Sequence, residues 1–79
     1  MYEVQMPKFG AMMKNGEVQE WYVKVGDKVS VGDNLCEISS EKITNVLESY
    51  VDGVVDSIIV EEGDSADIGD VIATIKTDK

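Results

Sequence analysis

The chain is short and acidic: in 79 residues, seven lysines stand against 16 acidic residues, for a formal net charge of −9. Nucleic acid and anionic membranes bind cationic faces, so this charge argues against both and suits a basic protein partner. One cysteine and no histidine exclude an intrachain disulfide and argue against a zinc site or another metal centre. The length predicts a single domain, 1–79.

Short runs rich in valine and isoleucine, separated by Gly-Asp pairs, predict strands rather than helices throughout the chain. In chain order we expect strands at 2–7, 17–24, 28–31, 34–39, 43–49, 54–60, 65–68 and 71–76. The Gly-Asp pairs predict turns, because glycine accepts a positive φ and aspartate bonds its own downstream amides. No apolar run approaches the length of a membrane span, and no signal peptide is recognisable, so we expect a soluble protein.

The sequence is an internal repeat: residues 16–39 align with residues 53–76 at an offset of 37, with eight of 24 positions identical. The repeat predicts an all-β fold of two four-stranded antiparallel sheets related by a pseudo-twofold axis, packed as a flattened barrel or sandwich. Residues 11–16 are an insertion that only the first copy carries. The predicted core comprises Val4, Met6, Val18, Trp21, Val23, Leu35, Ile38, Val46, Val55, Ile58, Val60, Ile72 and Ile75.

One lysine, Lys42, lies in the segment that joins the two copies. So few residues separate the flanking strands that they must form a tight hairpin, with Lys42 exposed at or beside its tip. Glu41 and the exposed position favour the charged ammonium, so Lys42 is unsuited to Schiff-base or general-base catalysis. Cys36 has no activating neighbour in sequence, and no nucleophile–base pair is recognisable. We therefore expect a non-catalytic domain whose lysine another enzyme modifies.

Segments along the whole chain resemble lipoyl domains, members of the biotinyl/lipoyl-attachment family. The segments that carry the resemblance are Met6-Pro7-Lys8-Phe9-Gly10, Gly16-Glu17-Val18, Gly26-Asp27-x-Val29-x-x-Gly32-Asp33, Ser40-Glu41-Lys42-Ile43 and Gly53-Val54-Val55. The resemblance implies a barrel-sandwich hybrid fold with lipoate joined to Lys42 through an amide bond. It also implies a carrier of acyl groups and electrons in a multienzyme complex of the 2-oxo-acid dehydrogenase type, as part of its acyltransferase (E2) component.

The same resemblance implies the partners. A lipoate ligase or lipoyl transferase would attach the cofactor. A thiamine-diphosphate-dependent dehydrogenase (E1), the acyltransferase core (E2) and a dihydrolipoyl dehydrogenase (E3) would be visited by the carrier. We expect a bacterial cytoplasmic protein, with the mitochondrial matrix as the alternative.

The hairpin departs from the family pattern at two positions, with Glu41 in place of the usual aspartate and Ile43 in place of alanine or valine. The run after Lys42, with Met-Pro-Lys-Phe-Gly and Ala-Met-Met near the start, is most similar to lipoyl domains of acetoin dehydrogenase complexes. Biotin is the alternative cofactor, although biotin-carrier domains place methionines beside the acceptor lysine. A barrel-sandwich binding module without a covalent cofactor is the other alternative, although such modules have long helical insertions in the hairpin.

The insertion 11–16 is expected beside the Lys42 hairpin, because we expect the first strand to pair with the strand that follows Lys42. In the family, such a loop helps the partner dehydrogenase to recognise its carrier. The residues predicted for recognition are Glu41, Ile43, Ala11, Met12, Met13 and Lys14. For Met12 and Met13 the sequence leaves open a place in the core instead of the surface. We expect Cys36 to be an inert, partly buried hydrophobe.

Overall fold

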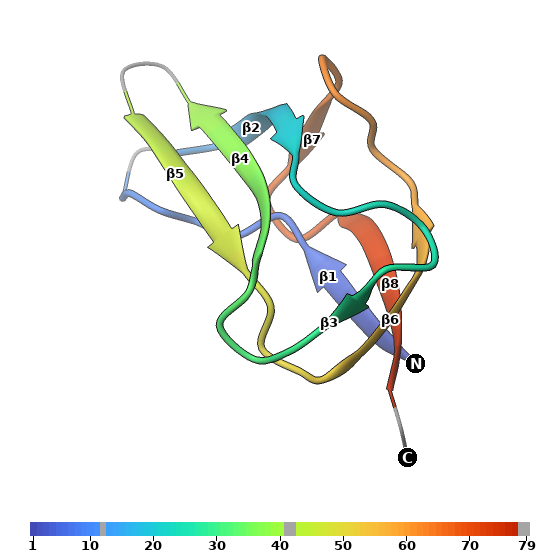
Figure 1. The fold of residues 1–79 in the computed structure, drawn as a ribbon. Helices are drawn as coiled ribbons and strands as arrows, with labels where there is room; N and C mark the ends of the chain where they lie inside the picture. Colours follow the sequence, from blue (N-terminus) through green and yellow to red (C-terminus); the bar gives the residue numbers. More distant parts are fainter. Residues whose placement is uncertain (12, 41–42, 78–79) are drawn as a thin grey trace.

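The computed structural model describes residues 1–11, 13–40 and 43–77, and this part of the chain is built from strands and turns (Figure 1). All eight expected strands are present, with ends that differ from the predicted ones by up to three residues. Their bounds are β1 Tyr2–Gln5, β2 Asn15–Trp21, β3 Lys28–Val29, β4 Asn34–Ser40, β5 Ile43–Glu48, β6 Gly53–Ile58, β7 Ser65–Asp67 and β8 Val71–Thr77.

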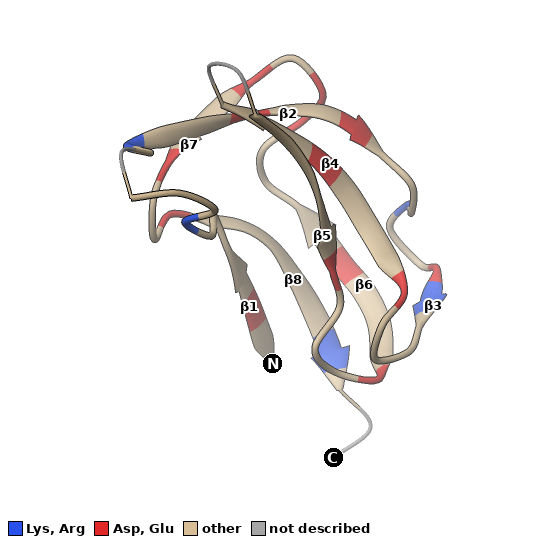
Figure 2. Cartoon of the chain, turned by 90° about the vertical axis from the view of Figure 1, so that its left-hand side faces the viewer, with Lys and Arg blue, Asp and Glu red and all other residues tan. Residues whose placement is uncertain are grey.

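The strands form two four-stranded antiparallel sheets, in the orders β1-β8-β6-β3 and β5-β4-β2-β7, which confirms the predicted fold class. The apolar residues of both sheets meet between the layers and form one core. The molecule is elongated, with extents of 36 × 21 × 18 Å. The start of β1 and the end of β8 lie together at one end, and the end of β4 and the start of β5 lie at the other (Figures 1 and 2).

The pairing register repeats between the two sheets, as the internal repeat predicts. Val29 pairs with Gly53 in one sheet, and Ala66, at the equivalent position, pairs with Gly16 in the other. Both central strand pairs also contain a bulge at the same position, between Val18 and Glu20 and between Val55 and Ser57. Because even the irregularities are repeated, each half of the chain serves as a reference for the other.

The Gly-Asp turns join the halves to one another. The Gly26 N–H donates to the Val55 carbonyl at 2.8 Å, and the Val55 N–H donates to the Asp27 carbonyl at 2.9 Å. The equivalent turn of the second half makes the same two bonds with Val18 of the first half, again at 2.8 and 2.9 Å. Gly26 has a φ of 96°. A side chain would strain this conformation, so the turn prediction is confirmed together with its reason for glycine. The expected role of aspartate is wrong in direction, because Asp27 Oδ2 accepts the N–H of Lys24, three residues upstream, at 2.9 Å.

The core contains most of the apolar residues predicted for it. Eight of the 13 are buried: Val4, Met6, Val18, Leu35, Ile38, Val55, Ile72 and Ile75. Four lie partly buried against the core: Trp21, Val23, Ile58 and Val60. Six buried residues outside that list of 13 complete the core: Met13, Val29, Cys36, Leu47, Ala66 and Ala73.

The prediction for Val46 is wrong, because this side chain is 41% exposed while its neighbour Leu47 is 3% exposed. Side chains alternate between the two faces of a strand, so only one of two adjacent apolar residues can point into the core. In β5 the inward residue is Leu47, which pairs with the buried Cys36 of β4. Both residues are apolar, so the sequence pattern alone could not decide between them.

We predict that Gly53→Ala lowers the free energy of unfolding by about 1–3 kcal/mol, because overpacking a close contact costs that much. A methyl group at Gly53 would overlap the backbone carbonyl oxygen of Lys76, which cannot move without disturbing β8. At Gly16, the equivalent position, the methyl would meet only side-chain atoms, at 2.8–2.9 Å. Urea denaturation measures both variants, and Gly10→Ala, where the nearest atom lies at 3.7 Å, is the control. An equal loss at Gly53 and Gly10 would contradict the prediction.

Candidate functional site

The candidate site is the end of the β4–β5 hairpin (Figure 1). The two strands remain paired up to Ser40 and Ile43, which pair with each other. Only Glu41 and Lys42 stand between these two residues in the sequence, and both lie outside the described residues. The described flanks therefore agree with the predicted tight hairpin, because two residues of chain join two paired positions.

The flanks of this connection lie at the surface. β5 is an edge strand of its sheet, and the Ile43 side chain is 48% exposed at the strand's first position. Thr44 is exposed as well, while Ser40 on the inner strand is half-buried. An enzyme approaching the end of the hairpin would therefore meet the side of β5 first.

The insertion lies beside the hairpin, as expected, although the expected reason is wrong. In the described chain β1 pairs with β8, not with the strand after Lys42. The insertion reaches the hairpin because β2, which begins at its end, pairs with β4. The two are in contact at Ser40, whose hydroxyl donates to the Asn15 carbonyl oxygen at 3.1 Å. Gly10, the residue before the insertion, also lies near the hairpin, because a methyl added to Gly10 would be 3.7 Å from Ile43 Cδ1.

The residues predicted for recognition fall into two groups. Ala11 and Lys14 are exposed in the insertion, close to the exposed Ile43. Met13 is buried, with 9% of its surface exposed, and its sulfur accepts the Phe9 N–H at 3.3 Å. Of the two places that the sequence left open for Met13, the core is therefore the one observed, and its side chain attaches the insertion to the core. Met12 lies outside the described residues, as do Glu41 and Lys42.

The sheet that carries the hairpin has an acidic outer face that the sequence analysis did not single out (Figure 2). Four glutamates lie at positions whose repeat equivalents are uncharged: Glu17, Glu20, Glu37 and Glu48, where the other half has Val54, Ser57, Thr74 and Gln5. The neutral equivalents show that the fold does not need charge at these positions. The 37-residue offset identifies the first three of these differences, and the alignment of residues 48–53 with residues 5–10 identifies the fourth.

One pair within this face opposes folding. Glu20 on β2 pairs with Glu37 on β4. At the equivalent positions of the other sheet, the Ser57 and Thr74 hydroxyls are hydrogen-bonded at 2.6 Å. The Glu37 carboxylate accepts a bond from the exposed Tyr22 hydroxyl at 2.8 Å, and this bond raises the pKa of Tyr22 above its usual value. Like charges directly opposite each other are destabilising, so we expect this pair to lower the stability of the fold.

Cys36 is not a candidate nucleophile. Its side chain is fully buried in the core, and burial raises the pKa of its thiol to about 12. The thiolate is the reactive form of cysteine, so at neutral pH this side chain is an inert small hydrophobe. The expectation of an inert cysteine is confirmed, with burial complete rather than partial.

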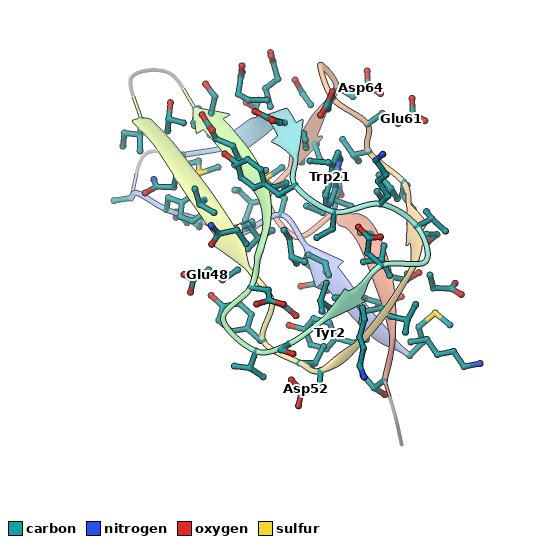
Figure 3. All side chains as sticks on the ribbon, viewed as in Figure 1. Tyr2, Trp21, Glu48, Asp52, Glu61 and Asp64 are labelled. Atoms are coloured by element: carbon teal, nitrogen blue, oxygen red, sulfur yellow. The ribbon has the colours of Figure 1, made fainter. Side chains whose placement is uncertain are left out.

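A surface hollow of about 490 Å³ lies away from the hairpin end, lined by Trp21, Val23, Lys24, Val25, Ile58, Glu61 and Glu62. Trp21 pairs with Cys36, toward the opposite end of β4 from Ser40. Its indole N–H donates to the Val60 carbonyl at 2.9 Å, which places it beneath the loop that bears Glu61 and Asp64 (Figure 3). Within the described ranges there is no cluster of three metal-ligating side chains and no helix able to cross a membrane.

A family model, Biotin_lipoyl, described as "Biotin-requiring enzyme", matches residues 2–75 of this chain. Among curated proteins, the chain is 38% identical over 74 residues to the dihydrolipoyllysine-residue acetyltransferase component of the pyruvate dehydrogenase complex of Staphylococcus aureus (strain Mu50). The match covers 94% of this chain and 17% of that protein. The component of the same name from Corynebacterium glutamicum is 39% identical, over 94% of this chain and 11% of that protein.

Among solved structures, the chain is similar to the lipoyl domain of the 2-oxoglutarate dehydrogenase complex from Azotobacter vinelandii. The TM-score is 0.79 over 96% of both chains, at 24% sequence identity. At this identity the likeness concerns the fold, and it agrees with the two-sheet architecture described above.

We predict that Glu20→Gln stabilises the domain by about 0.2–1 kcal/mol at low salt, because it removes the repulsion between Glu20 and Glu37. The gain should shrink in about 1 M salt, where charges are screened within roughly 3 Å. Urea denaturation at two salt concentrations measures the effect. Glu3→Gln is the matched control, since Glu3 pairs with the uncharged Thr74. A gain that is independent of salt, or equal in the control, would contradict this explanation.

Proposed function

The chain belongs to the Biotin_lipoyl family, and from this membership we propose that it is a non-catalytic carrier domain whose Lys42 bears covalently attached lipoate. The observation that carries the proposal is the position of Lys42 in the chain, between the paired residues Ser40 and Ile43 at the surface end of a two-stranded ladder. Attachment through an amide bond needs a reachable amine, and the exposure of Ile43 and Thr44 supports access from the side of β5.

Lipoate is favoured over biotin by the names of the relatives and by the residues beside the lysine. The relatives from Staphylococcus aureus and Corynebacterium glutamicum are dihydrolipoyllysine-residue acetyltransferase components. Glu41 and Ile43 flank Lys42, in place of the methionines of biotin carriers. The single methionine pair followed by lysine, Met12-Met13-Lys14, lies in the insertion rather than in the hairpin, and Met13 is buried.

The shape of the domain suits a tethered carrier. The start of β1 and the end of β8 lie at the end of the molecule away from the end of β4 and the start of β5 (Figure 1), so a polypeptide continuing in that direction would leave the hairpin unobstructed. When bound, the lipoyl group supplies a disulfide that carries acyl groups and electrons between active sites. Tethering raises the effective concentration of such a carrier at each site toward the mM range.

The proposed partners follow from this role. A lipoate ligase or lipoyl transferase attaches the cofactor, and a thiamine-diphosphate dehydrogenase, an acyltransferase core and a dihydrolipoyl dehydrogenase use it, in the bacterial cytoplasm. The chain spans 17% of the length of its Staphylococcus aureus relative. The identity of the complex and of its acyl group is therefore proposed from the names of the relatives. The relatives favour a pyruvate dehydrogenase complex, and the resemblance to acetoin dehydrogenase carriers makes that complex the second candidate.

The acidic face supports partner recognition. Glu20 and Glu37 remain opposite each other although the other half of the chain folds with neutral residues there. A face of one charge sign raises the rate of encounter with a surface of the opposite sign. We therefore propose that the enzymes approaching Lys42 present a basic surface to β2 and β4.

We predict that Lys42→Ala folds as the parent does but takes up no lipoate, because the β4–β5 ladder is formed by the residues on either side of Lys42. Incubation with a lipoate–protein ligase, ATP and lipoate, followed by intact-mass measurement, tests this. Lys28→Ala, which removes an exposed lysine from β3 in the other sheet, is the control and should be modified normally. A folded Lys42→Ala protein that still gains the mass of a lipoyl group would refute the assignment.

We predict that Glu41→Ala weakens acylation by the thiamine-diphosphate dehydrogenase more than it weakens attachment of lipoate. The charge beside the lysine affects encounter with the dehydrogenase, and loss of a peripheral charge changes association by roughly tenfold or less. Comparing kcat/KM for both reactions measures the difference. Glu3→Ala, which removes an exposed charge from β1 in the other sheet, is the control. Equal losses in the two reactions would count against a recognition role for Glu41.

A further inference from the structure

The insertion is held to the rest of the domain by bonds at its end. Within it, the Met13 N–H donates to the Gly10 carbonyl at 3.1 Å. The Lys14 carbonyl accepts the Ile68 N–H at 3.3 Å, and the next carbonyl, that of Asn15, accepts the Ser40 hydroxyl at 3.1 Å. Ser40 is also the last described residue before Lys42. One hydroxyl thus connects the base of the insertion to the stem of the hairpin.

The equivalent place in the other sheet, β1-β8-β6-β3, is connected differently. Val31, the equivalent of Ile68, donates its N–H to the Asp52 carboxylate at 2.9 Å, and Asp52 is the equivalent of Asn15. The Val31 N–H is thus bonded by a side chain, whereas the equivalent Ile68 N–H is bonded by the backbone of the insertion. The equivalent of Ser40 is Thr77, which pairs with Gly53 at the end of β8.

We propose that Ser40 is a positioning residue for attachment at Lys42, an inference that rests on the proposed function. Its hydroxyl holds the hairpin stem at Ser40 and the end of the insertion at Asn15 as one surface, which an attaching enzyme meets preformed when it approaches Lys42. Ile43 pairs with Ser40 and belongs to the same surface. Ser40 does not touch the reacting atoms and acts through this surface.

The proposed role predicts a particular kinetic signature. Without the hydroxyl, the stem at Ser40 and the insertion at Asn15 spend part of the time in other relative orientations, and the apparent affinity falls in proportion to the competent fraction. Loss of one net hydrogen bond reduces that fraction by about threefold to tenfold. The orientation that reaches the bound state is unchanged, so kcat should stay within about twofold of the parent value.

The test compares three variants of the whole 79-residue domain, with a lipoate–protein ligase, ATP and lipoate as the probe. Ser40→Ala should raise KM for the domain by about threefold to tenfold. Ser40→Thr keeps a hydroxyl at the same position and should restore the parent KM. Ser39→Ala, a substitution of the adjacent half-buried serine on β4, should leave KM unchanged.

A second measurement separates positioning from general destabilisation. Amide hydrogen exchange at Met13 and Ile68, whose N–H groups donate to the Gly10 and Lys14 carbonyls, should become faster in Ser40→Ala, while exchange in β6 and β8 stays at the parent rate. Faster exchange throughout the domain would instead show a purely structural role and overturn the proposal. An unchanged KM in Ser40→Ala, or an equal rise in Ser40→Thr or Ser39→Ala, would overturn it as well. If the parent domain takes up no lipoate at Lys42, the proposed function itself fails, and that result is distinct from all of these.

Discussion

The reciprocal hydrogen bonds between the turn of one half and the strand of the other hold this fold together. Gly26 and Asp27 bind Val55, while Gly63 and Asp64 bind Val18 in the same way. Each half thus completes the other, and neither four-stranded sheet is formed by a single half of the chain. The β4–β5 hairpin therefore extends from a platform whose two halves are bonded to each other at both turns.

The duplication also separates residues that the fold requires from residues that serve another purpose. The turn glycines and the bulges recur in both halves, and Gly16 of the first half corresponds to Gly53 of the second. The facing glutamates Glu20 and Glu37, the insertion and the Ser40 hydroxyl bond belong to the half that carries the hairpin. These features cluster around β2 and β4, and their concentration in one half supports a recognition role for that end of the molecule.

The strands, the turns and the two-sheet architecture were predictable, because Gly-Asp pairs and valine-rich runs recur at a constant offset. Three details were not. The choice between Val46 and Leu47 depended on the register of β5 against β4, which two adjacent apolar residues leave ambiguous. The partner of β1 is set by long-range pairing that local pattern does not report. The bond between Ser40 and Asn15 joins residues 25 positions apart.

The measurement that tests the central claim most directly is intact-mass analysis of the unmodified parent domain, combined with peptide mapping, after separate incubation with a lipoate–protein ligase and with a biotin–protein ligase. The carrier proposal predicts one lipoyl adduct, on the peptide that contains Lys42, and no adduct with the biotin enzyme. A biotinyl adduct at Lys42 would contradict the choice of cofactor. A lipoyl adduct at another lysine, or no adduct with either enzyme, would contradict the carrier function itself.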